Sequence, residues 1–386
     1  MEATSPLGDA LLVPRAPAWS VSWQELVRRH PWVRRMAGTP QDPIHHAEGD
    51  VAIHTEMVCR AMAALEGFRD LDDRAREIAF ASALLHDVAK PDCTRAGEDG
   101  RVTSHGHSVR GSIAARRILY ALDAPFAARE QVAALVRHHQ APFWLVDRED
   151  PVRLLATISQ TARCDLLALL AEADARGRTC DDQARILDNV ALFRACAEEE
   201  GCATTPYPFP SEHARFLYLA GRQSSTLRGD APKAYVPHVD FRCEVTVMSG
   251  MPGAGKDRWV ATHCKDLPVV SLDRLRAELD VDPEGEQGAV VQAAREEARA
   301  HLRAGRSFVW NATNVSRRVR AICTRLFADY DARIRIVYVE VPEATLRAQN
   351  RSRKKPVPDH VIDALLEKWE VPDLTEAHTV EHVLGT

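Results

Sequence analysis

The chain has none of the sequence features of a secreted or membrane-bound protein. No C-x-x-C pair occurs, and the nine cysteines are odd in number and irregularly spaced, which argues against a disulfide framework and against a cysteine zinc site. The N-terminal stretch is polar and proline-rich without a signal-peptide pattern, and no apolar run is long enough to cross a bilayer. We therefore expect a cytoplasmic protein without a membrane partner.

A strong charge of one sign is also missing. The formal net charge is −5 over 386 residues, so the whole chain is not a basic coat for nucleic acid, although a local basic groove is compatible with this value. Apolar residues make up 45% and charged residues 27%, the ordinary mixture of a globular protein. The length favours two or three domains over one.

The pattern of apolar residues divides the chain into two unlike halves. Residues 1–20 form a polar tail, and residues 21–220 place apolar side chains at helical spacing without a convincing strand, which predicts an all-α domain. Residues 221–241 are rich in proline, serine and glycine and are predicted to be a linker. Strand-like runs alternate with helical patterns in residues 242–386, which predicts an α/β domain with a parallel sheet. The expected strands are 244–248, 269–271, 307–310 and 333–341; the clearest expected helices are 50–65, 75–85, 108–122, 127–137, 161–175, 287–304 and 317–330.

The C-terminal half contains a phosphate-binding loop. Residues 250–257 read G-M-P-G-A-G-K-D, which fits G-x-x-x-x-G-K between a predicted strand and a predicted helix. Backbone N–H groups of such a loop point at phosphate oxygens, and Lys256 reaches the β- and γ-phosphates. Asp257 stands where Ser or Thr normally holds Mg²⁺, and a carboxylate is also able to ligate this ion. We expect ATP or GTP with Mg²⁺, bound by Gly250, Gly253, Ala254, Gly255, Lys256 and Asp257.

An aspartate and an arginine follow at the end of the next predicted strand. Asp273 is placed to accept a proton from an attacking hydroxyl, and Arg276, on the same helical face, is placed to hold an acceptor phosphate. A helix N-cap aspartate and a surface arginine account for the same pattern equally well.

This half resembles the phage-type polynucleotide kinase family over residues 243–372. The likeness rests on the G-x-P-G-x-G-K loop, the D-x-x-R pair and the basic segment 349–358, Q-N-R-S-R-K-K-P-V-P. It implies a P-loop NTPase fold that transfers an NTP γ-phosphate to a 5′-hydroxyl end. Asp273 would be the general base, Arg276 would bind the acceptor phosphate, and Arg353 would bind the donor phosphates. Gln349 replaces the first arginine of the family's lid; the loop after 308–310 adds Thr313 and Asn314 as phosphate candidates.

The N-terminal half contains a series of metal-ligand residues. His86 and Asp87 are adjacent at the end of an apolar helix and can converge on one ion, for which Mn, Fe, Co, Ni or Zn is better suited than Mg. The remaining candidate ligands are His54, His107, His138, His139 and Asp174, with Asp165 as the alternative to Asp174. A histidine on an apolar helix face is usually an ordinary core residue, but this order of histidines and aspartates rarely arises by chance.

The series resembles the HD phosphohydrolase superfamily, and most closely the HD domain of bacterial CCA-adding tRNA nucleotidyltransferases, over about residues 40–185. H-A-E-G-D (46–50), L-L-H-D-V-A-K-P (84–91), G-H-S-V-R-G (106–111) and E-A-D-A-R-G-R (172–178) carry the likeness. It implies one divalent ion, such as Mn²⁺, Co²⁺, Ni²⁺ or Zn²⁺, on His54, His86, Asp87 and Asp174. A second ion would use His107, His138 and His139. Lys90, Arg176 and Arg178 would neutralise substrate phosphate, or else are surface charges.

The order of the two halves resembles the bacterial HD-Pnk enzymes, which heal broken nucleic-acid ends. The resemblance implies a metal-dependent 3′-phosphatase or 2′,3′-cyclic phosphodiesterase joined to a polynucleotide 5′-hydroxyl kinase. RNA is the preferred substrate over DNA because a cyclic phosphate needs a 2′-hydroxyl, and the products would suit a separate nucleic-acid ligase. The alternatives are a small-molecule nucleotide kinase and phosphohydrolase, or a non-catalytic nucleotide-binding regulatory protein. Trp259, Trp310 and Trp369 are expected to be core or rim residues rather than stacked on bases.

Overall fold

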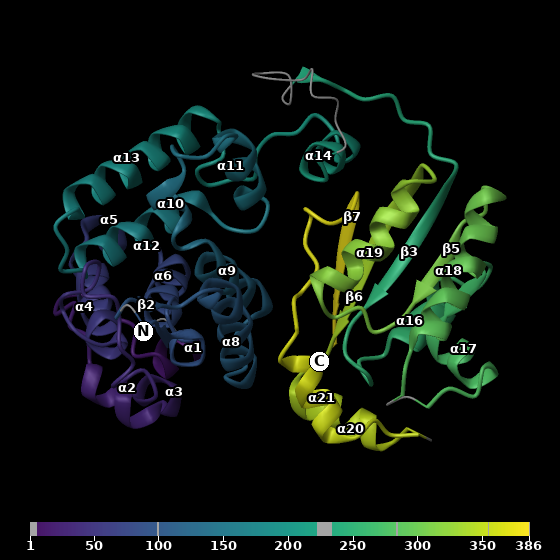
Figure 1. The fold of residues 1–386 in the computed structure, drawn as a ribbon, viewed down its shortest axis with the longest axis horizontal. Coiled ribbons are helices and arrows are strands. Elements are labelled where there is room, and N and C mark those ends of the chain that lie inside the picture. Colours follow the sequence, from purple (N-terminus) through teal and green to yellow (C-terminus); the bar gives the residue numbers. More distant parts are fainter. Residues whose placement is uncertain (1–5, 99, 222–233, 283–284, 354, 386) are drawn as a thin grey trace. The chain divides into compact units, whose positions relative to one another are not determined.

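The computed structural model describes residues 6–98, 100–221, 234–282, 285–353 and 355–385. The chain divides into two compact units, residues 1–208 and 209–386 (Figure 1). This division precedes helix α14 (Glu212–Leu219), which the sequence assigns to the first domain. Phe216 belongs to the core of the second unit, and Arg215 donates to the carbonyl oxygen of Leu374 at 3.1 Å, so α14 packs with the second unit. Residues 222–233 of the predicted linker lie outside the described residues.

The first unit is helical, as predicted for the residues after 20, and it has an HD-domain fold. The expectation of a tail at residues 1–20 is wrong, because the chain begins a helix at Pro6 and buries Leu7 and Leu11 fully. Five helices matter for the site: α4 (Val51–Ala64), α6 (Asp73–Leu85), α8 (His107–Ala121), α9 (Phe126–His138) and α12 (Cys164–Arg176). Asp50 and Asp72 cap α4 and α6 by accepting from the backbone N–H groups of Ile53 and Ala75. The other helices are α1 (Pro6–Ala10), α2 (Trp23–Arg29), α3 (Pro31–Arg34), α5 (Glu66–Arg69), α7 (Lys90–Cys93), α10 (Ala141–Trp144), α11 (Pro151–Ser159) and α13 (Gln183–Glu199).

The expectation of no strand in this half is wrong at one place. Strands β1 (Arg95–Ala96) and β2 (Val102–Thr103) form a small antiparallel hairpin. Each strand has only two residues, which is too short to show an alternating pattern in the sequence.

Helices α6 and α12 form the centre of the first unit because both are apolar on nearly every side. Phe80 and Leu84 of α6 and Leu167 and Leu170 of α12 are fully buried, each contributing about 2 kcal/mol from burial. Within the part of the chain that is described, no single helix combines the length and the apolar composition of a membrane span. The pair α11 and α12 meets both only when taken together, across a bend of 107°.

The second unit is the predicted α/β P-loop NTPase fold. Its five strands are all parallel in the order β4-β5-β3-β6-β7, so their carboxyl ends meet at one edge, where open α/β sheets bind ligands (Figure 1). The strands are β3 (Cys243–Ser249), β4 (Val269–Ser271), β5 (Phe308–Asn311), β6 (Ala332–Glu340) and β7 (Thr379–Leu384). The helices are α16 (Lys256–His263), α17 (Leu272–Glu278), α18 (Gly288–Arg303), α19 (Arg317–Ala328), α20 (Glu343–Arg351) and α21 (Asp359–Leu366). The edge strand β7 was not predicted.

A fully buried arginine connects α19 to the ligand edge of this sheet. Arg320 donates to both carboxylate oxygens of Glu376, at 2.8 and 2.9 Å. Its remaining nitrogen donates to the carbonyl oxygens of Asn314 at 2.9 Å and Glu370 at 2.8 Å. The guanidinium therefore fixes the loop after β5 and the segment before β7 against α19.

We expect Arg320→Met to destabilise the second unit by roughly 3–5 kcal/mol, because it leaves Glu376 as an unpaired buried charge and two carbonyl groups without their donor. Urea unfolding of the full chain, followed by tryptophan fluorescence, measures this loss. The exposed Arg318 on the same helix provides the control, and Arg318→Met should change the stability by less than about 0.5 kcal/mol. Equal stability of the two variants would contradict the role given to Arg320.

Candidate functional site

The first unit brings two imidazoles and two carboxylates together at its centre. His54 comes from α4, His86 and Asp87 follow α6, and Asp174 comes from α12, and all four side chains are buried. The Nε2 atom of His54 lies 3.3 Å from Nε2 of His86, 3.2 Å from Oδ1 of Asp174 and 3.8 Å from Oδ2 of Asp87. His86 Nε2 lies 3.2 Å from the same Oδ2 atom. These atoms are the predicted ligands of the first metal ion.

The second oxygen of Asp87 faces another pair of histidines. Asp87 Oδ1 lies 3.5 Å from Nε2 of His107, at the start of α8, and 4.0 Å from Nε2 of His139, just after α9. The two Nε2 atoms are 3.3 Å apart. Asp87 therefore presents one oxygen to each of two groups that are able to hold a metal ion.

Backbone carbonyl groups set the tautomer of these imidazoles. The Nδ1 atoms of His86, His107 and His139 each lie 2.8 Å from a carbonyl oxygen three residues earlier. A neutral imidazole that donates from Nδ1 has its lone pair on Nε2, so the lone pairs point into the cluster. Two such lone pairs 3.3 Å apart repel each other unless a cation lies between them and the carboxylates.

The charges of the cluster also fit a divalent cation. Burial alone would raise the pKa of Asp87, but the Lys90 ammonium beside it holds that pKa well below its usual range. Burial likewise opposes ionisation of Asp174, but the Arg178 guanidinium outweighs it and lowers the pKa. Asp87 Oδ1 is buried and has no hydrogen-bond partner among the described residues. Ionised carboxylates, inward lone pairs and an unsatisfied oxygen together form the ligand set that transition metals prefer.

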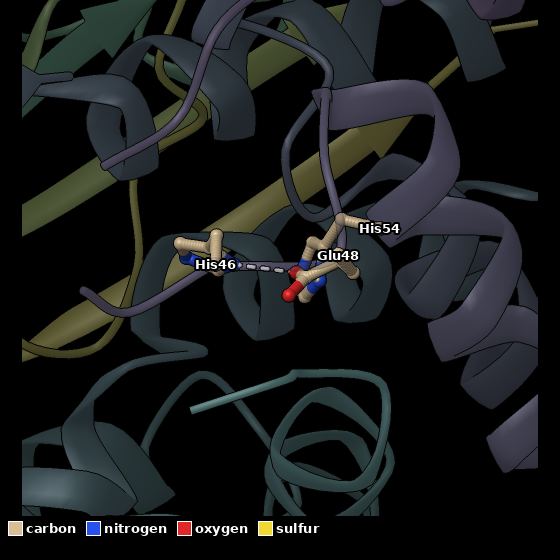
Figure 2. Close-up of side chains that lie close together, drawn as sticks. All are labelled: His46, Glu48 and His54. Atoms are coloured by element: carbon tan, nitrogen blue, oxygen red, sulfur yellow. Dashed lines mark hydrogen bonds and ion pairs between the residues drawn. The ribbon is translucent and has the colours of Figure 1, made fainter. Parts of the chain in front are cut away.

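A further carboxylate, not assigned a role from the sequence, orients His54 (Figure 2). Oε1 of Glu48 lies 2.8 Å from Nδ1 of His46 and 2.8 Å from Nδ1 of His54, and Oε2 accepts from the backbone N–H of Thr179 at 2.8 Å. Burial opposes ionisation of Glu48, but the hydrogen bonds from His46 and His54 lower its pKa. Burial lowers the pKa of His46 to about 4, so His46 is a neutral donor at pH 7. Glu48 is the carboxylate that a metal-binding histidine characteristically has behind it.

Not every predicted residue reaches the cluster. His139, rather than His138, shares the second group with Asp87 and His107. Asp165 lies at the start of α12, where it accepts from Nε of Arg163 at 3.0 Å, so Asp174 is the carboxylate beside His54. Arg176 is exposed and pairs with Glu172 instead of facing the metal ligands.

Two of the predicted phosphate-binding residues do lie at the cluster, but both already have partners. The Lys90 ammonium is 2.7 Å from Asp87 Oδ2 and donates to Gln41 at 2.7 Å. Arg178 donates to both oxygens of Asp174 at 2.8 Å. Both residues line a cavity of about 360 Å³ that also reaches His107 and His46, which is large enough for a small ligand.

In the second unit, the loop after β3 has the backbone of a phosphate cradle. Gly250, Gly253 and Gly255 have φ angles of +144°, +86° and +102°, a region that favours glycine. A side chain at Gly250 would lie 2.4 Å from the carbonyl oxygen of Val339 on β6. The Lys256 ammonium donates to the carbonyl oxygens of Gly250 at 2.8 Å and Met251 at 2.9 Å. A bound phosphate would accept hydrogen bonds from this ammonium and from the N–H groups of the loop.

Three of the remaining kinase candidates act electrostatically on Lys256. Burial lowers the pKa of Lys256 to about 8; Asp257 and Asp273 oppose this shift, and Arg353 adds to it, so all three charges are felt at the ammonium. Asp257 accepts from the side-chain amide of Asn311 at 2.7 Å. Asp273 pairs with Arg276 and is not the N-cap of α17, since Ser271 accepts the capping hydrogen bond. The N-cap interpretation of Asp273 is therefore wrong.

Two asparagines stabilise the backbone next to the phosphate-binding loop. Asn314, predicted to contact phosphate, is buried, and its amide donates to the carbonyl oxygen of Met248 at 2.8 Å, which makes it a structural residue. The neighbouring Thr313 contributes its carbonyl oxygen to Gly250 N–H at 3.0 Å. Asn350, which has no assigned role in the sequence analysis, exchanges two hydrogen bonds with the backbone of Val357, at 2.7 and 3.0 Å. This exchange closes the base of the basic segment that contains Arg353.

Comparison with known protein families agrees with this division. Residues 50–175 match the family model of the HD domain, and residues 245–372 match a family model of an AAA domain. The chain therefore has an HD phosphohydrolase-type domain followed by a kinase-like P-loop domain, the composition of a nucleotide-related enzyme. The first domain implies a divalent metal ion, and the second implies a nucleotide with Mg²⁺.

Relatives match only part of the chain. A multifunctional CCA protein of Halorhodospira halophila (strain DSM 244 / SL1) is 37% identical over 114 residues, which cover 30% of this chain and 25% of the relative. The same protein of Ralstonia nicotianae (strain ATCC BAA-1114 / GMI1000) is 34% identical over 179 residues, 44% of this chain and 38% of the relative. The chain thus spans well under half of these relatives. Among solved structures, one from Chloroflexus aurantiacus J-10-fl covers 37% of this chain and 86% of its own length at 13% identity, with a TM-score of 0.32.

We expect Mn²⁺ to raise the unfolding temperature of the first unit, since a ligand at a hundred times its dissociation constant stabilises a fold by about 2.7 kcal/mol. Asp174→Asn should lose most of this increase, because it removes a ligand beside His54. Asp165→Asn is the matched control and should retain it. Differential scanning calorimetry with Mn²⁺ and with EDTA measures the increase for each variant. A full Mn²⁺ response from Asp174→Asn would show that this carboxylate is not a ligand.

Glu48→Gln should weaken metal binding by about 10- to 100-fold, because the neutral amide no longer fixes the imidazole of His54 or raises its basicity. Isothermal titration with Mn²⁺ compares the dissociation constants. Glu56→Gln, on helix α4 with His54 but paired with Arg60 at the surface, should bind like the wild type. Equal affinities for all three proteins would remove Glu48 from the metal site.

Proposed function

We propose that the protein is a bifunctional nucleic-acid end-healing enzyme. Its HD domain hydrolyses 3′-phosphate and 2′,3′-cyclic phosphate ends, and its P-loop domain transfers the γ-phosphate of ATP or GTP to 5′-hydroxyl ends. In this proposal residues 21–208 contain the phosphohydrolase and residues 242–386 contain the kinase, with RNA preferred over DNA.

The observation that carries the proposal is the double metal-binding group around Asp87 in a chain that also contains a P-loop. The Asp87 oxygens, with His54 and His86 on one side and His107 and His139 on the other, offer two positions that share one carboxylate. Such shared positions suit phosphate ester hydrolysis. The relatives named as multifunctional CCA proteins support a nucleic-acid substrate for the same kind of domain.

In the phosphohydrolase site, a bound divalent ion would lower the pKa of a water molecule and polarise the phosphoryl oxygen. The protein side chains then have distinct tasks. Lys90, which now pairs with Asp87, is placed to turn its ammonium toward the substrate phosphate. Arg178 holds Asp174 in place with two hydrogen bonds, so we assign it to positioning rather than to substrate binding.

In the kinase site, the carboxylate of Asp273 would take the proton of the 5′-hydroxyl as that oxygen forms its bond to the γ-phosphorus. The bond from the γ-phosphorus to the β–γ bridging oxygen would break at the same time, and the nucleoside diphosphate would leave. Lys256 and the loop N–H groups would hold the donor phosphates, and Arg353 would stabilise the transferring group. Arg276 would release Asp273 and bind the acceptor phosphate. Asp257, held by Asn311, would replace the usual hydroxyl ligand of Mg²⁺.

Substitutions at Lys256 and Asp87 should separate the two activities. We expect Lys256→Ala to abolish 5′ phosphorylation and leave 3′ dephosphorylation intact, and Asp87→Ala to do the reverse, because each change removes a group needed at one site only. The substrate is a short RNA with a 5′-hydroxyl and a 2′,3′-cyclic phosphate, incubated with ATP or GTP, Mg²⁺ and Mn²⁺. Gel electrophoresis resolves all four combinations of end groups.

Other results would decide among the alternatives. Turnover of free nucleotides with no change at either RNA end would replace the polymer with a small-molecule substrate. No reaction with any nucleotide or with Mn²⁺, Co²⁺, Ni²⁺ or Zn²⁺ would favour a regulatory protein.

A further inference from the structure

The cavity beside the metal ligands has an exposed tryptophan in its wall. The wall residues next to the cluster are His46, Lys90, His107 and Arg178, and Trp144 from α10 lines the same cavity. A single exposed apolar side chain is ordinary on a protein surface. Trp144 differs because it lines the same cavity as a metal ligand, His107, and two cations, Lys90 and Arg178.

The other tryptophans are more protected. Trp144 is 40% exposed, whereas Trp259, Trp310 and Trp369 are 7%, 2% and 1% exposed and belong to the core, as expected from the sequence. All seven tryptophans lie in the described part of the chain, and Trp144 is the only one in the exposed class.

The exposure of Trp144 is not a consequence of a loose backbone. The preceding residue, Phe143, is 2% exposed, and its carbonyl oxygen accepts from the buried amide of Asn189 at 2.8 Å. The next residue, Leu145, is 1% exposed. On the other side, the Arg185 guanidinium carbon lies 5.7 Å from the Trp144 ring centroid, and Arg185 is itself held by Asp182 at 2.7 Å. The fold therefore holds an indole ring at the cavity by anchoring the residues around it.

The cavity is polar and cationic at one part and aromatic at another. Lys90 and Arg178 lie with the metal ligands, where a phosphate would be, and Trp144 offers a flat apolar surface in the same space. A terminal nucleotide has the same division into an anionic phosphate and a flat base. Aromatic side chains bind bases of any sequence, since every base has a π-face.

We propose that Trp144 is a stacking platform for the terminal nucleobase of the 3′ end that enters the HD site. This inference rests on the proposed function and extends it: the HD site recognises a nucleotide by its base as well as by its phosphate. The four bases should be accepted to a similar extent, and an end without a base should be a poor substrate.

The test compares two oligonucleotides that differ only at the 3′-terminal residue, one with a normal nucleoside 3′-phosphate and one with a stable abasic analogue. Wild-type enzyme should favour the substrate with a base by about 5- to 150-fold in kcat/KM, the range of one base–aromatic stack. The preference should lie mainly in KM, since stacking remote from the phosphate binds substrate and transition state alike.

Variants of the full chain locate the effect. Trp144→Ala should lose the preference by reacting more slowly with the normal end only, and Trp144→Phe should keep most of it. Leu192→Ala, an exposed position on α13, is the control and should behave as the wild type. Equal rates of the wild type on both substrates would overturn the stacking inference and leave the proposed function standing. Failure of the wild type to remove either 3′-phosphate would instead overturn the proposed function, and this inference with it.

Discussion

The carboxylate of Asp87 lies between two pairs of imidazoles, and the arrangement of the first unit depends on it. One oxygen faces His54 and His86, and the other faces His107 and His139. Four separate helices deliver these rings. Backbone carbonyl groups at Nδ1 fix the rings of His86, His107 and His139, and Glu48 fixes that of His54, so their lone pairs cannot turn away. Without a cation, the same atoms would repel one another in a buried space. The buried carboxylates and lone pairs therefore need compensating positive charge. Lys90 supplies part of it, and bound metal ions would supply the rest.

The second unit depends instead on close approach of backbones. Gly250 packs against the carbonyl oxygen of Val339, and Gly253 lies close to Asn350, which also closes the basic segment around Arg353. Asn350 thus supports both the phosphate-binding loop and the basic segment. Buried hydrogen bonds of Arg320 and Asn314 connect α19 and the loop after β5 to the end of β3. Asp257 is the departure from the usual loop, and its contact with Asn311 places a carboxylate where a hydroxyl normally meets Mg²⁺.

Residue patterns predicted the two-domain architecture and the identity of most clustered side chains, because helical periodicity and the P-loop are local signals. They did not distinguish His138 from His139: consecutive residues at a helix end point about 100° apart, and only packing shows which one turns inward. Glu48 was hidden because a carboxylate in a coil before a helix has no spacing rule. The same holds for Asn350, whose side chain bonds the backbone of a nearby loop residue, Val357. Arg320 was hidden because its partner Glu376 is distant in sequence. Strand β7 escaped notice because an edge strand with partly exposed residues has little apolar character.

Counting bound metal ions tests the role of Asp87 most directly. The protein is loaded with Mn²⁺ or Co²⁺ in the absence of nucleotide, freed of excess ion, and examined by native mass spectrometry. Two ions per chain are predicted for the wild type, one for His139→Ala, and none retained by Asp87→Ala, since that change removes the ligand common to both groups. One ion in the wild type, with the same count in His139→Ala, would contradict a shared carboxylate and leave a single metal site on His54, His86, Asp87 and Asp174.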